Sequence, residues 1–275
     1  RDSRDNALFV VRIGQYASDK ASQYSFIESA KNKGYNVLLF DGQLDTPFMN
    51  QLEQKLEKCR FSRVDADTID KLIVKEDAPE LKLTTSQKSD LEEVFRAETP
   101  KDDAKVNYTV SVEALGENEL PVIVTQNEWM RRMKEMSAVQ GGAMSFYGEM
   151  PDTFNLVINA SHPLVNRVVT DMDEKTKAEL EPVMAAISKE EVRKAELNKA
   201  KEGKKDEEIP QADKDELESV NKRIDEQRQK RNDILAGFAK NDKLVSQLID
   251  LALLSNNMLK GEHLTNFIKR SISLM

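Results

Sequence analysis

The start of the fold is decided by the stretch Tyr24-Ser-Phe-Ile-Glu-Ser-Ala-Lys-Asn-Lys-Gly-Tyr-Asn-Val-Leu-Leu-Phe-Asp41. Its first half has the apolar spacing of a helix, for which Ser18 and Asp19 are candidate N-caps. Gly34 stands where a helix often ends on a left-handed glycine. The apolar second half is typical of a buried strand, and a further strand is predicted over residues 8–13. Together they predict a β-α-β unit, whose two strands are parallel.

Other elements lie on either side of a polar stretch at residues 75–83, the best linker candidate. Before it we predict a helix over 47–58 and a strand over 61–64, which complete a small α/β (β-α-β) module. After it we predict a helix from residue 85, followed by strands over 106–113, 121–125 and 154–159. The expected fold class is therefore α+β, with two domains at residues 1–80 and 81–275.

A charged, helix-favouring region extends from residue 173 to residue 240. Its sparse apolar residues favour two solvated helices joined by a loop at 203–210, so we predict an antiparallel helical arm at about residues 175–232. A run this polar is also compatible with disorder in its middle.

Two apolar helical stripes close the chain. They consist of Leu244, Leu248 and Leu251 in one helix and Leu264, Phe267, Ile268 and Ile272 in the next. Each helix can bury its partner's apolar side chains only in part, so we predict a four-helix bundle with a second copy of the chain. The alternative is that both helices pack back onto their own domain.

Methionines concentrate in one short region, which holds five of the ten in the chain. The spacing of these residues places four apolar side chains on one face of a predicted helix: Trp129, Met130, Met133 and Met136. Arg131 and Arg132 fall mostly elsewhere on that helix, and the loop beyond it carries Met144, Phe146 and Tyr147. The methionine face either packs into the core or, because methionine adapts its shape at low cost, binds apolar segments of other proteins.

Composition narrows the classes of function. The net charge of −8 argues against general binding of nucleic acid or of anionic membranes, and no apolar run is long enough to span a bilayer. The single cysteine, Cys59, excludes an intramolecular disulfide and indicates a reducing compartment. The chain starts without methionine and has no signal peptide, which suggests a piece of a longer protein.

Motifs for catalysis are missing from the sequence. The two histidines, His162 and His263, lack partners at metal-ligand spacing, and Cys59 has no histidine nearby in sequence. Neither Gly-x-x-x-x-Gly-Lys nor Gly-x-Gly-x-x-Gly occurs. A small α/β enzyme is therefore the weakest of the hypotheses.

Specific motifs in the sequence resemble those of the heat-shock protein 90 (Hsp90) chaperone family, in particular of its bacterial, HtpG-type members. The stretch at residues 24–41 is similar to the last α/β segment of that family's middle domain. Phe154-Asn-Leu-Val-Ile-Asn-Ala-Ser-His-Pro-Leu-Val165 is similar to its strand-then-helix motif, with Ala160 in place of the usual proline. Residues 130–136 and 143–150 resemble its methionine-bearing helix and the adjacent loop.

This resemblance implies a distal middle-domain segment followed by a carboxy-terminal dimerization domain. It implies a homodimer that binds non-native client proteins through Trp129, Met130, Met133, Met136, Met144, Phe146 and Tyr147. We expect no cofactor and no ATP hydrolysis in this chain, because the family binds ATP and magnesium in an amino-terminal domain.

Two features depart from the family pattern. The charged arm is longer than the family leads us to expect, which keeps open the alternative of a scaffolding module that binds a partner through the arm. The chain ends Arg270-Ser-Ile-Ser-Leu-Met275, without the acidic peptide that recruits tetratricopeptide-repeat co-chaperones. We therefore expect a bacterial or organellar parent protein, with a cytoplasmic bacterial location favoured.

Overall fold

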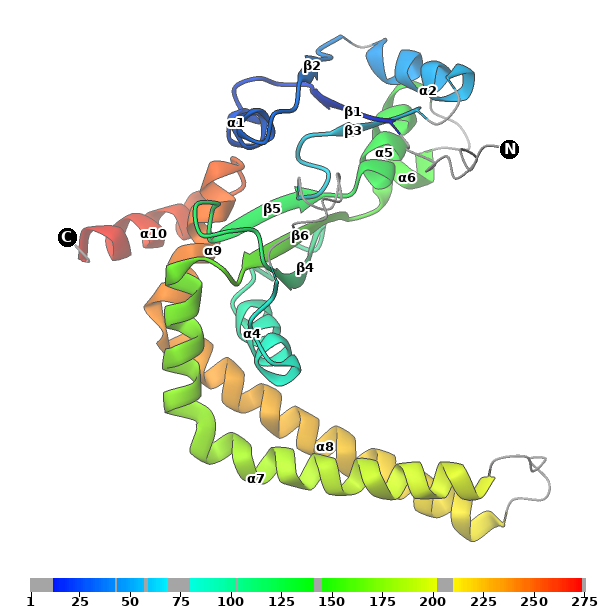
Figure 1. Cartoon of the computed structure of the whole chain (residues 1–275), viewed down its shortest axis with the longest axis vertical. Helices are drawn as coiled ribbons and strands as arrows, with labels where there is room; N and C mark the ends of the chain where they lie inside the picture. Colours follow the sequence, from blue (N-terminus) through cyan, green and yellow to red (C-terminus); the bar gives the residue numbers. More distant parts are fainter. Residues whose placement is uncertain are drawn as a thin grey trace, which may run out of the picture. The chain divides into compact units, whose positions relative to one another are not determined.

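The computed structural model describes residues 12–42, 44–56, 59–68, 80–101, 103–140, 145–201 and 210–273. The fold is α+β, with two three-stranded sheets among these residues (Figure 1). The chain divides into two compact units. Unit 1 comprises Arg1–Leu83, Thr99–Val165 and Gln247–Met275, and unit 2 comprises Thr84–Glu98 and Asn166–Ser246. Most of the predicted linker lies outside the described residues, so the domain boundary near residue 80 stays a prediction.

The first sheet of unit 1 is the predicted α/β module. Its elements are β1 (Arg12–Ala17), α1 (Tyr24–Asn32), β2 (Val37–Leu39), α2 (Asp45–Lys55) and β3 (Cys59–Arg63). The strand order is β2-β1-β3 and both pairings are parallel, which confirms the β-α-β unit. Gly34 has a φ of 85°, as expected at the end of α1.

Several boundaries in this module differ from the prediction: α2 and β3 each begin two residues earlier than predicted, and two other differences have a local cause. Strand β1 continues to Ala17, beyond the predicted end at residue 13, because Ala17 is buried against Phe26 and Ile27 of α1. Helix α1 begins only at Tyr24, since the Asp19 carboxylate accepts hydrogen bonds from the backbone of Ala21 and Ser22 and forms a turn first. Residues 8–11 of the predicted strand lie outside the described residues.

The second sheet of unit 1 contains the other three predicted strands. They are β4 (Val106–Glu113), β5 (Val122–Gln126) and β6 (Asp152–Asn159), in the order β4-β6-β5. Strand β6 is parallel to β4 and antiparallel to β5. Asn159 at the end of β6 is buried and holds the loop that follows β4, accepting from the backbone N–H of Leu115 and donating to the carbonyl of Gly116 at 2.8 Å.

Four helices complete the described part of unit 1 or extend into it. Helices α5 (Glu128–Gln140) and α6 (Ser145–Glu149) separate β5 from β6. Helices α9 (Lys243–Ser255) and α10 (Gly261–Ser273) end the chain. Asn257, with a φ of 57°, stands at the predicted break between them. Arg270 of α10 forms an ion pair with Asp250 of α9, which holds the two helices together.

Unit 2 is helical and contains the predicted arm. It is built from α4 (Thr85–Ala97), most of α7 (Pro163–Lys201) and α8 (Gln211–Asn241). Helices α7 and α8 run side by side as a hairpin (Figure 1), with Leu197 buried against Val220 and Ile224. The helical arm is thus confirmed for the described residues, although α7 is one continuous helix from Pro163. None of the described helices has the length and apolar character needed to cross a membrane.

Candidate functional site

The charged side of helix α5 packs against the rest of the protein. Glu128, Arg131, Arg132 and Glu135 occupy the i, i+3, i+4, i+7 positions that are apolar in an ordinary amphipathic helix. Arg131 is only 6% exposed and Arg132 only 8%, whereas Trp129 on the opposite side is 55% exposed. The helix is therefore turned opposite to the usual orientation, with arginines inside and tryptophan outside.

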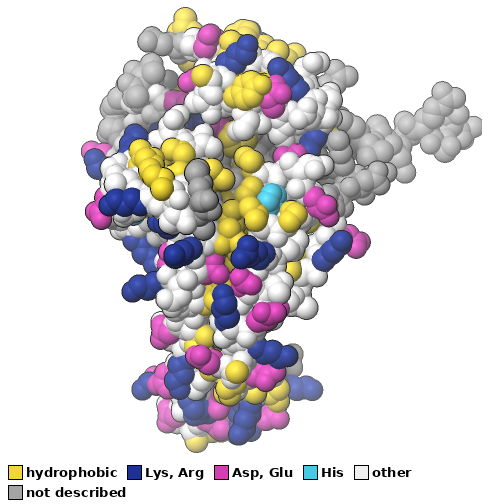
Figure 2. Space-filling view, turned by 90° about the vertical axis from the view of Figure 1, so that its left-hand side faces the viewer, with side chains coloured by type: hydrophobic (Ala, Val, Ile, Leu, Met, Phe, Trp, Pro, Cys, Tyr) yellow, Lys and Arg dark blue, Asp and Glu magenta, His cyan; other side chains and the backbone are white. Residues whose placement is uncertain are grey.

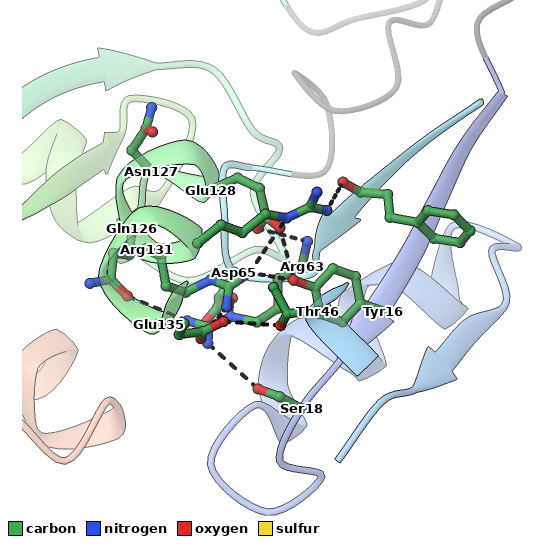
Figure 3. Close-up of polar contacts among 12 residues, drawn as sticks. Tyr16, Ser18, Thr46, Arg63, Asp65, Gln126, Asn127, Glu128, Arg131 and Glu135 are labelled. Carbon is green, nitrogen blue, oxygen red and sulfur yellow. Dashed lines mark hydrogen bonds and ion pairs between the residues drawn. The ribbon is translucent and has the colours of Figure 1, made fainter. Parts of the chain in front are cut away.

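The carboxylate of Glu128 is the centre of the buried side (Figure 3). It accepts hydrogen bonds from the Tyr16 hydroxyl at 2.8 Å, from the backbone N–H of Arg63 at 3.1 Å, and from the Arg131 Nη2 at 2.8 Å. Arg132 donates to it through Nε at 2.6 Å. The Tyr16 hydroxyl also accepts a hydrogen bond from Arg131. One carboxylate thus joins β1, β3 and α5.

Arg132 extends this cluster to α2. Its Nη1 donates to Glu53 at 3.0 Å and to the side chain of Asn50 at 3.2 Å. Its Nη2 donates to the Phe61 carbonyl at 2.7 Å, while the Phe61 N–H donates to Glu53 at 2.6 Å. We call Tyr16, Glu53, Glu128, Arg131 and Arg132 the Glu128 cluster. Two arginines and two carboxylates balance its charge, which buried ion pairs require.

The ionisation of the cluster follows from these contacts. Burial, together with the negative charge of Glu128, raises the pKa of Tyr16 to about 12. Burial alone would raise the pKa of Glu128, but Arg131 and Arg132 outweigh it and hold the pKa below its usual value. Burial lowers the pKa values of both arginines, and the combined attraction of the neighbouring acidic groups, with Glu128 the largest contributor, more than reverses this. Glu128, Arg131 and Arg132 are therefore charged at neutral pH, and Tyr16 is protonated.

The opposite side of α5 presents apolar side chains to solvent. We call Trp129, Met130, Met133 and Met136 the outer face; the three methionines are half-buried. The Trp129 ring packs edge-on against Tyr147 of α6, with centroids 5.8 Å apart, and Phe146 beside it is 65% exposed. Six of the seven predicted client-binding residues are thus brought together, and Met144 lies outside the described residues.

A cavity of about 770 Å³ adjoins this face where α5 approaches α2. Met136 lines it from α5, and Pro47 and Met49 line it from α2. The Asn50 side chain donates a hydrogen bond to the Met136 sulfur at 3.7 Å. Arg131 and Glu135 of the charged side of α5 also line the cavity, which therefore combines apolar, amide and charged groups.

A second apolar surface lies on α10. None of the side chains described on α10 is buried, and Ile268 and Ile272 are 47% and 66% exposed. Leu264 and Phe267 are half-buried, and Leu251 of α9 is 44% exposed. Figure 2 views the side on which α10 lies, and hydrophobic side chains gather there. Of the remaining predicted interface residues, Leu248 is buried in the protomer and Leu244 is half-buried.

The described residues also bear on metal binding and on the role of His162. No group of three or more histidines, cysteines, aspartates or glutamates within them could hold a metal ion. His162 accepts a hydrogen bond from the backbone N–H of Leu164 at 3.1 Å and so supports the start of α7.

Sequence reasoning missed the buried role of Glu128, Arg131 and Arg132. The sequence indicates only that Arg131 and Arg132 fall mostly away from the methionine face, and opposite charges three and four residues apart are typical of exposed helix ion pairs. The available signal was that these charges occupy the positions of an apolar stripe. Their partners, Tyr16 and Glu53, are too distant in the chain to be identified from spacing.

Comparison with known proteins gives one consistent result. The model of the Hsp90 protein family matches residues 10–187. The chaperone protein HtpG of Bacteroides fragilis is 54% identical over 260 residues, or 94% of this chain and 38% of that protein. HtpG of Bacteroides thetaiotaomicron is 50% identical over 260 residues, and HtpG of Porphyromonas gingivalis 44% over 262 residues, with the same coverage.

The chain spans only 38% of the length of these relatives. The family match ends at residue 187, whereas the alignments with the relatives include 260 of the 275 residues and therefore most of the arm. The arm is accordingly a feature that this chain has in common with those relatives.

Proposed function

Because this chain belongs to the Hsp90 protein family, we propose that it is the client-binding and dimerizing part of a molecular chaperone that assists the folding of non-native proteins. The observation that carries this proposal is the reversed orientation of α5. Trp129 is exposed and the methionines are half-buried, while Arg131 and Arg132 are buried. Exposed apolar side chains that adapt their shape suit a surface that binds many unfolded segments.

Client binding is tested by replacing Trp129, Met133 and Met136 with serine. The triple variant should keep the fold, because these side chains are exposed or half-buried, and should lose the ability to suppress aggregation of a heat-denatured protein. Val192→Ser on the arm is the matched control, since Val192 is apolar and 59% exposed. A folded triple variant that still protects as well as the parent chain would refute the client role of the outer face.

Dimerization is proposed through α9 and α10. An apolar stripe that is exposed in the protomer is typical of a surface covered by a second copy, and four such helices can form a bundle across the dimer. The mass of the chain in solution, measured by light scattering with and without residues 256–275, tests this proposal. We expect a dimer that becomes a monomer on truncation; a monomer in both cases would contradict it.

ATP hydrolysis is assigned to the remainder of the parent protein, which we place in the bacterial cytoplasm. The chain alone should neither bind nor hydrolyse ATP with magnesium. If the purified chain released phosphate from ATP, and a substitution within the chain abolished that release, this assignment would be contradicted.

A further inference from the structure

The surface that receives α5 could accept either side of the helix. Tyr16 and Met49 are each only 1% exposed there, and the Phe40 ring lies between those of Tyr16 and Phe61, 5.7 and 6.0 Å away. Apolar groups of this kind would pack well against methionines. By hydrophobic burial alone, the outer face of α5 should turn inward and the charged side should face water.

What opposes this is the match between the charged side and the polar groups of the same surface. The Tyr16 hydroxyl, the Arg63 N–H, the Phe61 carbonyl and the Glu53 carboxylate each have a partner on α5. Three separate elements, β1, α2 and β3, supply them. Turning the helix would separate the half-buried Glu53 from Arg132 and leave the other polar groups of this surface without their partners, which is unfavourable.

Arg132 makes the most specific of these contacts. Its guanidinium donates from Nε, Nη1 and Nη2 to groups on α5, α2 and β3 at 2.6, 3.0 and 2.7 Å. A lysine has the charge but not the planar arrangement of donors, so it cannot replace this arginine. The orientation of α5 therefore depends on the shape of the charged group as well as on its sign.

We propose that Glu128, Arg131 and Arg132 are positioning residues that select which face of α5 is presented, so that neutralising the Glu128 cluster lets the helix turn and bury its client-binding face. The proposal rests on the proposed function for the role of that face, but the orientation itself can be measured separately. Trp129 is the only tryptophan in the chain, so its fluorescence reports the orientation of α5 alone.

The test compares the parent chain with the triple variant Glu128→Leu, Arg131→Met, Arg132→Leu. Apolar replacement of a whole buried ion cluster commonly leaves a protein folded, which circular dichroism checks. Glu128→Gln and Arg132→Lys, which nearly preserve side-chain size, repeat the test if the triple variant does not fold. Arg193→Leu is the control, because it removes an arginine from an exposed ion pair with Glu216.

Two readouts are taken on each folded variant. The first is the quenching of Trp129 fluorescence by acrylamide, and the second is the affinity for reduced, carboxymethylated lactalbumin, a permanently unfolded protein. In the cluster variants, we expect the Trp129 emission maximum to shift to shorter wavelength. We also expect acrylamide to quench the Trp129 fluorescence much less than in the parent chain. Affinity for the unfolded protein should fall by about an order of magnitude, and Arg193→Leu should change neither.

The outcomes separate the two proposals. If Trp129 stays as accessible to acrylamide in the folded variants as in the parent, the cluster does not set the orientation and this inference is overturned. If Trp129 becomes buried while the unfolded protein binds as before, the positioning role stands and the proposed function of the outer face is refuted.

Discussion

The Tyr16 hydroxyl donates a 2.8 Å hydrogen bond to the carboxylate of Glu128, which lies 112 residues later in the chain. This bond joins the central strand of the first sheet to the first turn of α5. Because Arg131 and Arg132 converge on the same carboxylate, the contact determines how the apolar side of α5 is displayed. A polar interaction inside the protein thus controls an apolar surface outside it.

Tyr16 should make the chain sensitive to alkali. Its pKa rises from 10.0 to about 12 in the folded chain, so the folded state favours the protonated hydroxyl. That contribution is complete below pH 10.0 and is lost as the pH rises toward about 12. Urea unfolding at a series of alkaline pH values should show this loss in the parent chain, and Tyr16→Phe should lack it. Equal pH dependence in both chains would contradict the prediction.

Glu128→Gln should destabilise the chain by about 3 kcal/mol at neutral pH, because it leaves two buried arginines without their main carboxylate. The lowered pKa of Glu128 also means that its contribution is present above pH 4.5 and is lost as the pH falls through the folded pKa. The variant should therefore lose stability less steeply in acid than the parent chain. Urea midpoints between neutral and acidic pH measure both effects, and parallel curves would argue against them.

The sequence predicted what is local and missed what depends on distant partners. Period-two alternation identified β4 correctly, and apolar spacing identified α5 and α10. The start of α1 was misplaced because Asp19 can cap a helix or form a turn with equal local chemistry. Which side of α5 faces inward could not be predicted, since that depends on groups such as the Phe61 carbonyl in another segment.

In unit 2, the ion pair between Arg231 and Asp90 should contribute more to stability than the ion pairs along the arm. Arg231 Nε donates to the Asp90 carboxylate at 2.8 Å, and the two side chains are only 13% and 10% exposed. Arg231→Leu should cost about 3 kcal/mol, because it leaves a nearly buried carboxylate unpaired. Arg193→Leu, in an exposed pair, is the matched control and should leave the urea midpoint unchanged. If Arg231→Leu and Arg193→Leu lowered the urea midpoint equally, burial of the ion pair would not determine its contribution to stability.

On α10, Ile268→Asp combined with Ile272→Asp should convert the expected dimer to a monomer. Both side chains are largely exposed in the protomer, so the substitutions should not unfold it, but two carboxylates in an apolar interface would remain unpaired. Light scattering over a range of protein concentrations measures the change. Val192→Asp is the control for adding a charge at an exposed apolar position. A dimer that persists in the double variant would place the interface elsewhere.

Shortening the arm should leave client protection and dimerization intact. Leu197 and Leu217 pack in the same small cluster with Val220 and Ile224, so residues 198–216 can be replaced by a short glycine–serine linker without opening that cluster. The paired arginines and glutamates further along, such as Arg223 with Glu190, remain in place. Suppression of aggregation and mass in solution should both match the parent chain, because the apolar cluster and the Arg223–Glu190 ion pair of the arm are retained. A shortened chain that no longer protects, although it is folded and has the parent's mass, would instead assign the arm a direct role in binding a partner, as the scaffolding alternative requires.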